Sequence, residues 1–413
     1  MSLLTAVAPL TIDMYVPGFP DLGRDLAAGE PAVQLSMSAF LIGLVAGQLV
    51  IGPLSDGLGR RRLLVPGTAA FALLSACCAL MPTAPLLVAG RFLQGCAGAA
   101  GLVLARAVLT DRFAGPRLPL YFSILAMILG VAPVLGPLLG GMIVTASGWR
   151  AVFWVLTALG LVMLAATLLG VPESLPPDRR SPGGLRPAFA SMVALLSRRA
   201  FTGYTLTLGL AAGAMFVYIG ASSYVFQNGF GLSAVQYGLV FAVNAAVMLI
   251  ASAIFGLAAR WVALPALLSG YLAIGTLGAL ALAIQVTLAP TLTGTWLCLA
   301  IMLFGIGGIF PAVTTITQII GHARAGAASA LSGGAAYLFG ALAAPLSGTT
   351  PQAMAWIMLA AMALAVLALL AARPWHPLPE GASHEHHAPD HGPGRTERPP
   401  DPPVQRGRPR RRP

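Results

Sequence analysis

Long apolar stretches recur along almost the whole chain, and only short polar or proline-containing segments separate them. An α-helix needs about 20 mainly apolar residues to cross a bilayer. Twelve stretches of this kind can be delimited, which predicts an all-α membrane protein with twelve transmembrane helices. The predicted ranges are 2–19, 34–54, 63–80, 85–110, 118–144, 149–171, 201–226, 234–258, 262–286, 291–320, 326–347 and 352–371.

The composition excludes an ordinary soluble protein. Charged residues make up only 9% of the chain and the mean hydropathy is +0.83, whereas about a quarter of the residues in soluble domains are charged. We therefore expect the lipid bilayer to be the main partner of this chain. Residues 1–20 lack a basic start and contain Pro9, Asp13 and Pro17, so a cleaved signal peptide is not expected.

The arginines predict the orientation of the helices. If the amino terminus lies inside, twelve arginines fall in inside loops and only two in outside loops. Cytoplasmic loops carry an excess of basic residues, so we expect both termini in the cytoplasm. The net charge of +11 then reflects topology and does not indicate nucleic-acid binding. The inside arginines are Arg60, Arg61, Arg62, Arg112, Arg117, Arg179, Arg180, Arg186, Arg198, Arg199, Arg260 and Arg324, and the outside ones are Arg24 and Arg150.

One long segment rich in proline and arginine, residues 172–200, divides the apolar stretches into six and six. This pattern predicts two six-helix bundles, at 1–171 and 201–372, joined by a cytoplasmic linker and able to rock about a central site. After residue 372 the composition changes to Pro, Arg, His and Gly, which predicts a disordered tail over 373–413. Its cluster from His384 to His391 is only a compositional hint of metal binding, and we expect no metal site and no cofactor.

A short charged loop, residues 52–63, lies between the second and third apolar stretches. Asp56 and Arg60 are four residues apart, and Asp111 ends the fourth predicted helix on the same side. We expect a charge network that can hold the inner ends of these helices together. Each surface ion pair contributes only about 0–1 kcal/mol, which suits a switch that must open. The predicted network comprises Gly52, Asp56, Gly59, Arg60, Arg61 and Asp111.

Asp13 is the one carboxylate well inside a predicted helix. An ionised side chain at the bilayer centre costs about 2.5–3.5 kcal/mol, so such residues usually face a cavity or have a partner. The predicted partner is Arg91, because helices 1 and 4 place both side chains in the outer half of the bilayer. The pair either exchanges protons or holds the two helices together permanently. Arg106 lies roughly 22 Å further along its helix than Arg91, and we expect it to join the inner charge network.

Three segments resemble motifs of the major facilitator superfamily, a family of secondary transporters. They are the loop 52–63, the sequence RFLQGCAGAA that starts at Arg91, and the sequence PVLGPLLGG at 133–141. In that family the loop is a cytoplasmic gate, and the third segment resembles an antiporter motif. Its small residues allow helices to pack closely. The motif residues here are Pro133, Gly136, Pro137, Gly140 and Gly141.

Further strings resemble the bicyclomycin/chloramphenicol resistance subfamily of drug efflux transporters. They are DMYVP at 13–17, ARA at 105–107, GY at 203–204, YVFQ at 224–227, YGL at 237–239, and Asn244. The resemblance implies antiport of small amphipathic drugs, such as chloramphenicol-like or bicyclomycin-like compounds, against protons in a bacterial inner membrane. It makes Asp13 the proton carrier and Arg91 its tuning partner, and we expect a monomer. Relatives usually begin with a short cytoplasmic segment, so an internal start at Met1 stays open.

In such transporters helices 1, 4, 7 and 10 line the cavity, which nominates substrate contacts. Tyrosine is a natural candidate because it combines an apolar ring with a polar tip. The same side chains would also serve to satisfy hydrogen bonds between helices, and both interpretations stay open. The candidates are Tyr15, Gln94, Tyr218 and Tyr224, with Asn244 of helix 8 in addition.

Three other functions compete with this interpretation. An intramembrane enzyme is disfavoured, because no histidine precedes His322 and a serine nucleophile needs a base. A channel is disfavoured, because a lone carboxylate and two bundle-like halves indicate alternating access. A proton-coupled exporter of an amino acid or another small metabolite stays open as the alternative to drug export.

Overall fold

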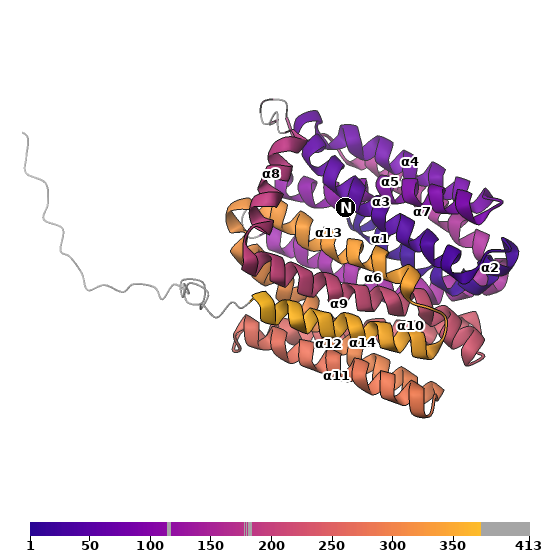
Figure 1. Cartoon of the computed structure of the whole chain (residues 1–413). Coiled ribbons are helices and arrows are strands. Elements are labelled where there is room, and N and C mark those ends of the chain that lie inside the picture. The colour runs from indigo at the N-terminus through magenta and orange to yellow at the C-terminus, as the bar shows by residue number, and fades with distance from the viewer. Residues whose placement is uncertain (114–116, 177, 179, 181–183, 373–413) are drawn as a thin grey trace, which may run out of the picture. The chain divides into compact units, whose positions relative to one another are not determined.

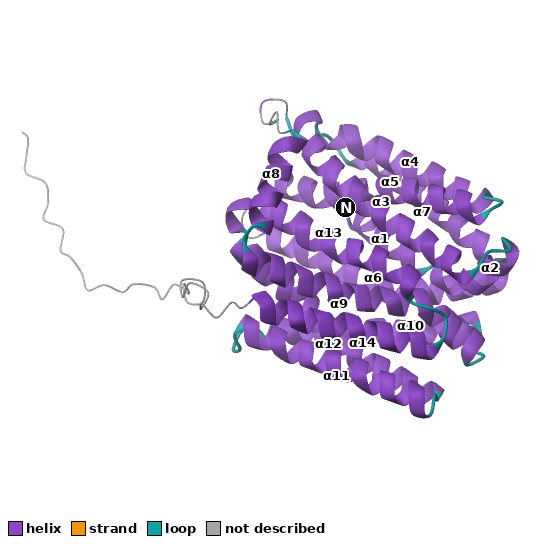
Figure 2. Ribbon diagram, in the orientation of Figure 1, coloured by secondary structure: helices purple, strands orange, loops and turns teal. Residues whose placement is uncertain are grey.

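The computed structural model describes residues 1–113, 117–176, 178, 180 and 184–372, and these residues are helical with short loops and no strand (Figure 2). The elements are α1 (Ser2–Asp13), η1 (Val16–Gly18), α2 (Phe19–Asp25), α3 (Glu30–Leu58), α4 (Arg60–Leu80), α5 (Ala84–Arg112), α6 (Arg117–Ser147), α7 (Trp149–Gly170), α8 (Leu185–Leu196), α9 (Arg199–Ser223), η3 (Tyr224–Gly229), α10 (Ala234–Ala258), α11 (Leu264–Leu288), α12 (Leu292–Ile320), η4 (His322–Arg324), α13 (Ala325–Ala343), η5 (Ala344–Leu346) and α14 (Pro351–Ala372).

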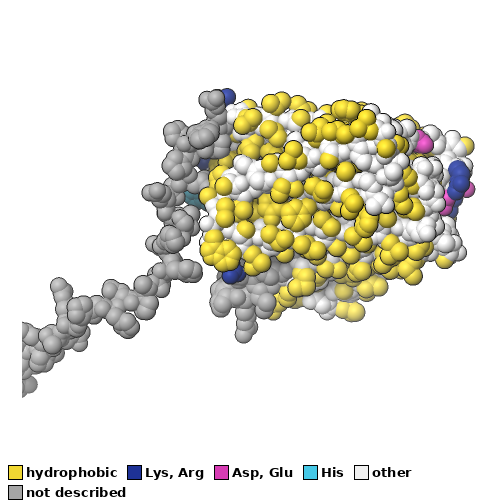
Figure 3. All heavy atoms as spheres, turned by 90° about the horizontal axis from the view of Figure 1, so that it is seen from below, with side chains coloured by type: hydrophobic (Ala, Val, Ile, Leu, Met, Phe, Trp, Pro, Cys, Tyr) yellow, Lys and Arg dark blue, Asp and Glu magenta, His cyan; other side chains and the backbone are white. Residues whose placement is uncertain are grey.

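Twelve helical segments in this described part of the chain are long and apolar enough to cross a membrane. The predicted fold class and the predicted number of spanning helices are therefore confirmed. On the face drawn in Figure 3, apolar side chains cover a broad belt, and the charged side chains lie at its two ends. A belt of this kind is what the hydrocarbon core of a bilayer requires of the surface that it contacts.

The two ends of the helix bundle differ in charge. The ends of α3, α5 and α10 and the starts of α4, α9 and α13 lie together, and most arginines of the loops are found there. We call this the arginine-rich end. The other end, here the opposite end, carries mainly Asp21, Arg24, Asp25, Glu30 and Arg150.

The helices pack in two groups. In the first group α3 packs on α5, α4 on α7, and α1 on α5 and α6; in the second, α11 packs on α12, α9 on α13 and α14, and α10 on α12. The groups meet where α6 contacts α10 and where α3 contacts α13. Figure 1 shows the long helices running roughly side by side. A cavity between two such groups is therefore bordered by helices of both.

The segment expected to be a plain linker, residues 172–200, contains the helix α8. It lies across one end of the bundle (Figure 1) and contacts α3 of the first group and α9 and α13 of the second. Helix α8 is amphipathic: Met192 and Leu195 are buried, whereas Phe189 and Val193 on another face are exposed. The predicted tail at 373–413, including the cluster from His384 to His391, lies outside the described residues.

The first predicted span, 2–19, is not one continuous helix. Helix α1 ends at Asp13, and the chain continues through η1 into the short helix α2. Pro17 explains the break, because it has no N–H to donate to the carbonyl of Asp13 four residues earlier. The carboxylate of Asp13 therefore sits at the end of a broken helix, in the middle of the membrane-spanning segment 2–25.

Candidate functional site

A cavity of about 1020 Å³ lies between the two helix groups. The first group lines it with α1, α3, α5 and α6, and the second with α9, α10, α12 and α13. At the arginine-rich end the exposed residues Ala323, Arg324 and Gly326 belong to its wall. The cavity is therefore open at that end and extends inward as far as Asp13 and Tyr218.

The two groups contribute different chemistry to the cavity wall. The charged residues deep in the wall and at its first-group rim are Asp13, Asp56 and Arg106. The second group supplies aromatic rings and methionines, together with Arg324 at the mouth. Its aromatic residues in the wall are Phe216, Tyr218, Phe241, Phe310 and Tyr337, and its methionines are Met215 and Met248; α8 adds Met192. A molecule in the cavity would thus contact an apolar wall with a few charged side chains on one side and an aromatic, polarisable wall on the other.

Asp13 lines the cavity and is only 4% exposed. Gly136 of α6 lies directly against the Cβ of Asp13, where an added Cβ on the glycine would come within 2.8 Å. Within the described residues, no hydrogen bond or ion pair joins the Asp13 carboxylate to another group. The carboxylate is thus enclosed by protein on most sides and faces the cavity.

The predicted pairing of Asp13 with Arg91 is wrong for this conformation. Arg91 is fully buried, and its guanidinium lies over the rings of Tyr15, Phe40 and Phe153, with ring-centre distances of 4.8, 4.4 and 5.7 Å. It donates hydrogen bonds to Gln94 Oε1 (2.7 Å) and to the carbonyl of Thr11 (3.3 Å). The two charges lie at similar depth, as expected, but depth along a helix does not determine which face of it a side chain occupies.

The Thr11 contact gives Arg91 a different partner from the expected one. The last carbonyls of α1 lose their helical donors where the helix ends, and a cation there also interacts favourably with the negative end of the helix dipole. Arg91 therefore holds the broken end of the helix that carries Asp13.

Of the five nominated substrate contacts, only Tyr218 lines the cavity. Tyr15 is fully buried and its hydroxyl is 2.8 Å from Ser36 Oγ. Gln94 is fully buried between Arg91 and Ser75 Oγ, to which its amide donates at 2.7 Å. For these two, the open alternative of hydrogen bonds between helices is the one that the structure supports.

Tyr224 and Asn244 also lie behind the cavity wall. Tyr224 is 3% exposed and its ring centre is 6.3 Å from that of Phe19, near the opposite end. Asn244 is fully buried, and its amide connects Trp296 to Tyr218. Sequence reasoning missed most of the cavity wall, because aromatic and methionine residues on an apolar helix look the same whether they face lipid, core or cavity. Arg106, expected in the inner network, lines the cavity instead and has no ion-pair partner among the described residues.

At the arginine-rich end, ion pairs join three of the residues predicted to form a charge network. Arg60 forms ion pairs with Asp56 (2.6 Å) and with Asp111 (3.1 Å), and it also donates to Ser55 Oγ. Gly59 has a φ of +101°, a conformation that favours glycine, at the turn between α3 and α4. Arg61 Nη2 donates to the carbonyl of Leu168 at 2.9 Å. Gly52 lines the cavity, and a Cβ added to it would lie 3.7 Å from Cγ1 of Val103.

Glu173 is a further member of this network that sequence reasoning missed. Its carboxylate accepts the backbone N–H groups of Arg60 (2.8 Å) and Arg61 (3.3 Å), at the start of α4. Burial raises the pKa of Glu173, but its bonds to four backbone N–H groups outweigh this, and the net pKa is lowered from 4.5. The position of Glu173 just after the apolar stretch 149–171, next to loop arginines, was a sequence signal that could have placed it in the network. All members found belong to the first helix group or the segment directly after it, so the network does not bridge the groups in this conformation.

The glycines of the motif on α6 allow three helices to approach closely. Gly140 lies against the carbonyl of Met14, Gly141 against the carbonyl of Ala234 of α10, and Gly238 of α10 against the carbonyl of Pro137. A side chain at these positions would collide with backbone. Pro133 of the same motif lines the cavity. Helix α6 is therefore packed between α1 of its own group and α10 of the other.

The opposite end is closed by polar contacts between the groups. Gln34 of α3 donates to the carbonyls of Gly220 (3.3 Å) and Gly348 (3.1 Å), and Gln227 of η3 donates to the carbonyl of Pro17 (3.0 Å). These contacts and the close packing of α6 on α10 separate the cavity from that end. The conformation is thus open at the arginine-rich end and closed at the other.

Comparison with known proteins agrees with this geometry. The family model described as Major Facilitator Superfamily matches residues 1–345. The chain belongs to the major facilitator superfamily. Members of this superfamily are transporters and not enzymes, so the chain is a multi-pass membrane transporter that binds small molecules.

Individual superfamily members are similar to it over much of its length. The uncharacterized MFS-type transporter YdgK of Bacillus subtilis is 35% identical over 89% of this chain and 93% of that protein. A bicyclomycin resistance protein homolog of Haemophilus influenzae is 30% identical over 61% of this chain and 63% of that protein. The multidrug resistance protein MdtL of Escherichia coli is 30% identical over 60% of this chain and 63% of its own length.

A solved structure shows the same fold. A bacterial homolog of the human lysosomal transporter Spinster, in an inward-facing and unoccupied conformation, superposes with a TM-score of 0.70 over 90% of this chain and 94% of that chain, at 18% identity. The arrangement of the superfamily helices is therefore established for this chain independently of its motifs.

Proposed function

We propose that this transporter exports small amphipathic drugs from the cytoplasm in exchange for protons, by alternating access. The arginine-rich end is the cytoplasmic one, both termini are cytoplasmic, the membrane is the bacterial inner membrane, and the working unit is a monomer. The excess of arginine at one end supports the orientation. The printed names of the bicyclomycin resistance homolog and of MdtL support drug export.

The observation that carries proton coupling is the position of Asp13. It is the deepest carboxylate in the cavity wall, and it has no ion-pair partner among the described residues. Burying an ionised carboxylate at the membrane centre costs about 2.5–3.5 kcal/mol. Closing the cavity over Asp13 is therefore more favourable when a proton has neutralised it.

The cost of burying ionised Asp13 couples the movement of protons to the movement of drug. When the cavity faces the outside, drug leaves and a proton binds Asp13, and the neutral form allows the outer end to close. When it faces the cytoplasm, the proton leaves into the cavity and drug binds beside the carboxylate. Pro17 and Gly136 assist because the broken helix and the missing side chain let Asp13 face the cavity between the groups.

The test is the variant Asp13→Asn, purified and reconstituted in proteoliposomes with chloramphenicol as the probe. Asparagine has nearly the same shape but does not take up a proton, so we expect uptake driven by an imposed pH gradient to be lost. The matched control is Asp21→Asn, which makes the same change in an exposed pair with Arg24 at the opposite end.

Gradient-driven transport that persists in Asp13→Asn contradicts the carrier role. A panel that includes amino acids alongside drugs separates the two substrate classes. Gradient-driven uptake of an amino acid and none of chloramphenicol or bicyclomycin would replace drug export by metabolite export.

A further inference from the structure

The cavity contains a tyrosine whose hydroxyl is oriented by a chain of two side chains, the fully buried Asn244 and the half-buried Trp296. Trp296 Nε1 of α12 donates to Asn244 Oδ1 of α10 at 3.0 Å, and Asn244 Nδ2 lies 3.0 Å from the hydroxyl oxygen of Tyr218. Tyr218 of α9 lines the cavity, whereas Asn244 is fully buried behind it. We call Trp296, Asn244 and Tyr218 the tyrosine relay.

The donor and acceptor roles in this relay follow from chemistry. An indole N–H can only donate, so the amide atom that faces Trp296 must be the oxygen of Asn244. The amide NH₂ group must then face Tyr218, and the tyrosine oxygen must accept. The phenolic proton therefore points away from Asn244. No acceptor for this proton is found among the described residues.

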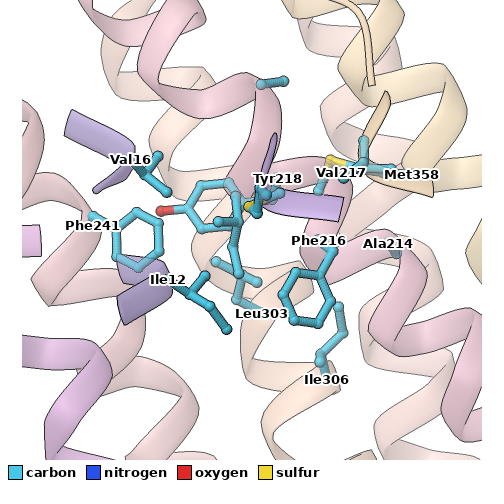
Figure 4. Close-up of a cluster of buried hydrophobic side chains, with 14 of the residues drawn as sticks. Ile12, Val16, Ala214, Phe216, Val217, Tyr218, Phe241, Leu303, Ile306 and Met358 are labelled. Atoms are coloured by element: carbon cyan, nitrogen blue, oxygen red, sulfur yellow. The ribbon is translucent and has the colours of Figure 1, made fainter. Parts of the chain in front are cut away.

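The environment of Tyr218 determines what such a donor contacts. Its ring is stacked on Phe241, with centres 5.2 Å apart and planes 25° apart. Figure 4 shows Tyr218 in the middle of an apolar cluster, with its hydroxyl oxygen directed towards the side of Val16 and Phe241. The cavity thus offers one oriented hydrogen-bond donor beside a flat aromatic surface.

We propose that this position is a subsite for an aromatic or other planar group that bears a hydrogen-bond acceptor, such as a carbonyl oxygen. The planar part packs on Phe241 and Phe216, and the acceptor receives a hydrogen bond from the Tyr218 hydroxyl. A donor group at this position would leave two donors facing each other, which is unfavourable. The inference rests on the proposed function for its biological meaning, because it describes which exported molecules the cavity prefers.

Binding to the full chain in lipid nanodiscs tests the subsite without any transport step. The probes are 2-acetylnaphthalene and 2-ethylnaphthalene, which share ring and chain length and differ in one carbonyl oxygen, each corrected for partition into empty nanodiscs. One neutral hydrogen bond corresponds to roughly a fivefold to tenfold change in affinity. We expect the wild type to prefer the ketone by about this factor.

The variant Tyr218→Phe keeps the stacked ring and removes the donor, so the preference should fall to about one. Trp296→Phe leaves the hydroxyl in place but frees the Asn244 amide to turn over, and the preference should fall partway. Tyr204→Phe is the matched control, because it makes the same change on the same helix at a buried residue outside the cavity wall.

The subsite is overturned if the wild type binds both probes equally or binds neither, or if Tyr218→Phe keeps the preference. A full preference retained in Trp296→Phe overturns the orienting role of the relay. Gradient-driven uptake in proteoliposomes is measured separately. A preference for the ketone without such uptake would refute proton-driven export and leave the subsite standing, and uptake without the preference would do the reverse.

Discussion

Replacing Arg91 distinguishes two roles for this buried cation. If Arg91 were the electrostatic partner of Asp13, its removal would shift the pH dependence of transport, because a cation 4–6 Å from a carboxylate moves its titration midpoint by about 1–3 pH units. In the structure Arg91 instead holds Thr11, Gln94 and three aromatic rings. We therefore expect Arg91→Ala to lower stability and transport rate, with the midpoint of the pH profile moved by less than about 0.5 units.

The loss of stability can be worked from the contacts. Hydrogen bonds that involve a charged group contribute about 1.5–3 kcal/mol each, and a desolvated cation over an aromatic ring contributes about 2 kcal/mol. Arg91 makes two such bonds and covers three rings. The cost of burying the guanidinium, several kcal/mol, offsets part of this sum. A net destabilisation of at least about 2 kcal/mol is expected.

The assay combines thermal unfolding in detergent with transport measured between pH 5.5 and 8.5. Arg24→Ala is the matched control, because Arg24 is an arginine in an exposed pair with Asp21 and should change stability by less than about 1 kcal/mol. A shift of one pH unit or more in the transport profile of Arg91→Ala, with unchanged stability, would refute the structural role and restore the pairing.

Three further expectations concern the charge network, the closed end and the motif on α6. Glu173 has a lowered pKa, so its stabilising bonds are fully present above pH 4.5 and are lost as the pH falls through the lowered pKa. Between pH 5 and pH 3.5, Glu173→Gln should therefore lose less thermal stability than the wild type. Equal losses in the two proteins would contradict this. Removing the amides in the double variant Gln34→Ala and Gln227→Ala deletes the three hydrogen bonds that join the groups at the opposite end, worth about 0.5–1.5 kcal/mol each. Spin labels across the opposite end should then report a larger population open there, whereas an unaltered distance distribution counts against a closing role of these bonds. Gly140→Leu should abolish folded protein in size-exclusion chromatography because it collides with the backbone of Met14, directly after α1, while Gly256→Leu, with nothing within 4 Å, should be tolerated. Equal behaviour of the two variants refutes the packing argument.

Contacts that depend on local spacing were predictable, and those that depend on helix rotation were not. Asp56 and Arg60 are four residues apart across a short turn, so their pairing follows from chain connectivity. Asp13 and Arg91 lie on different helices, and their depths could be inferred but their facing directions could not. The contacts of Gln34 and Gln227 between the groups carry no charge or periodicity signal, because across the groups each amide meets only backbone carbonyls.

The amino-acid sequence by itself determined the all-helical class, the twelve spans and the uneven distribution of arginine, because hydrophobic length and loop charge act residue by residue. The tertiary structure decided which side chains face the cavity, where the bundle is open, and that Arg91 holds the end of α1. These properties depend on how each helix is rotated about its axis, and in a chain that is apolar on nearly every face only packing against specific neighbours sets that rotation.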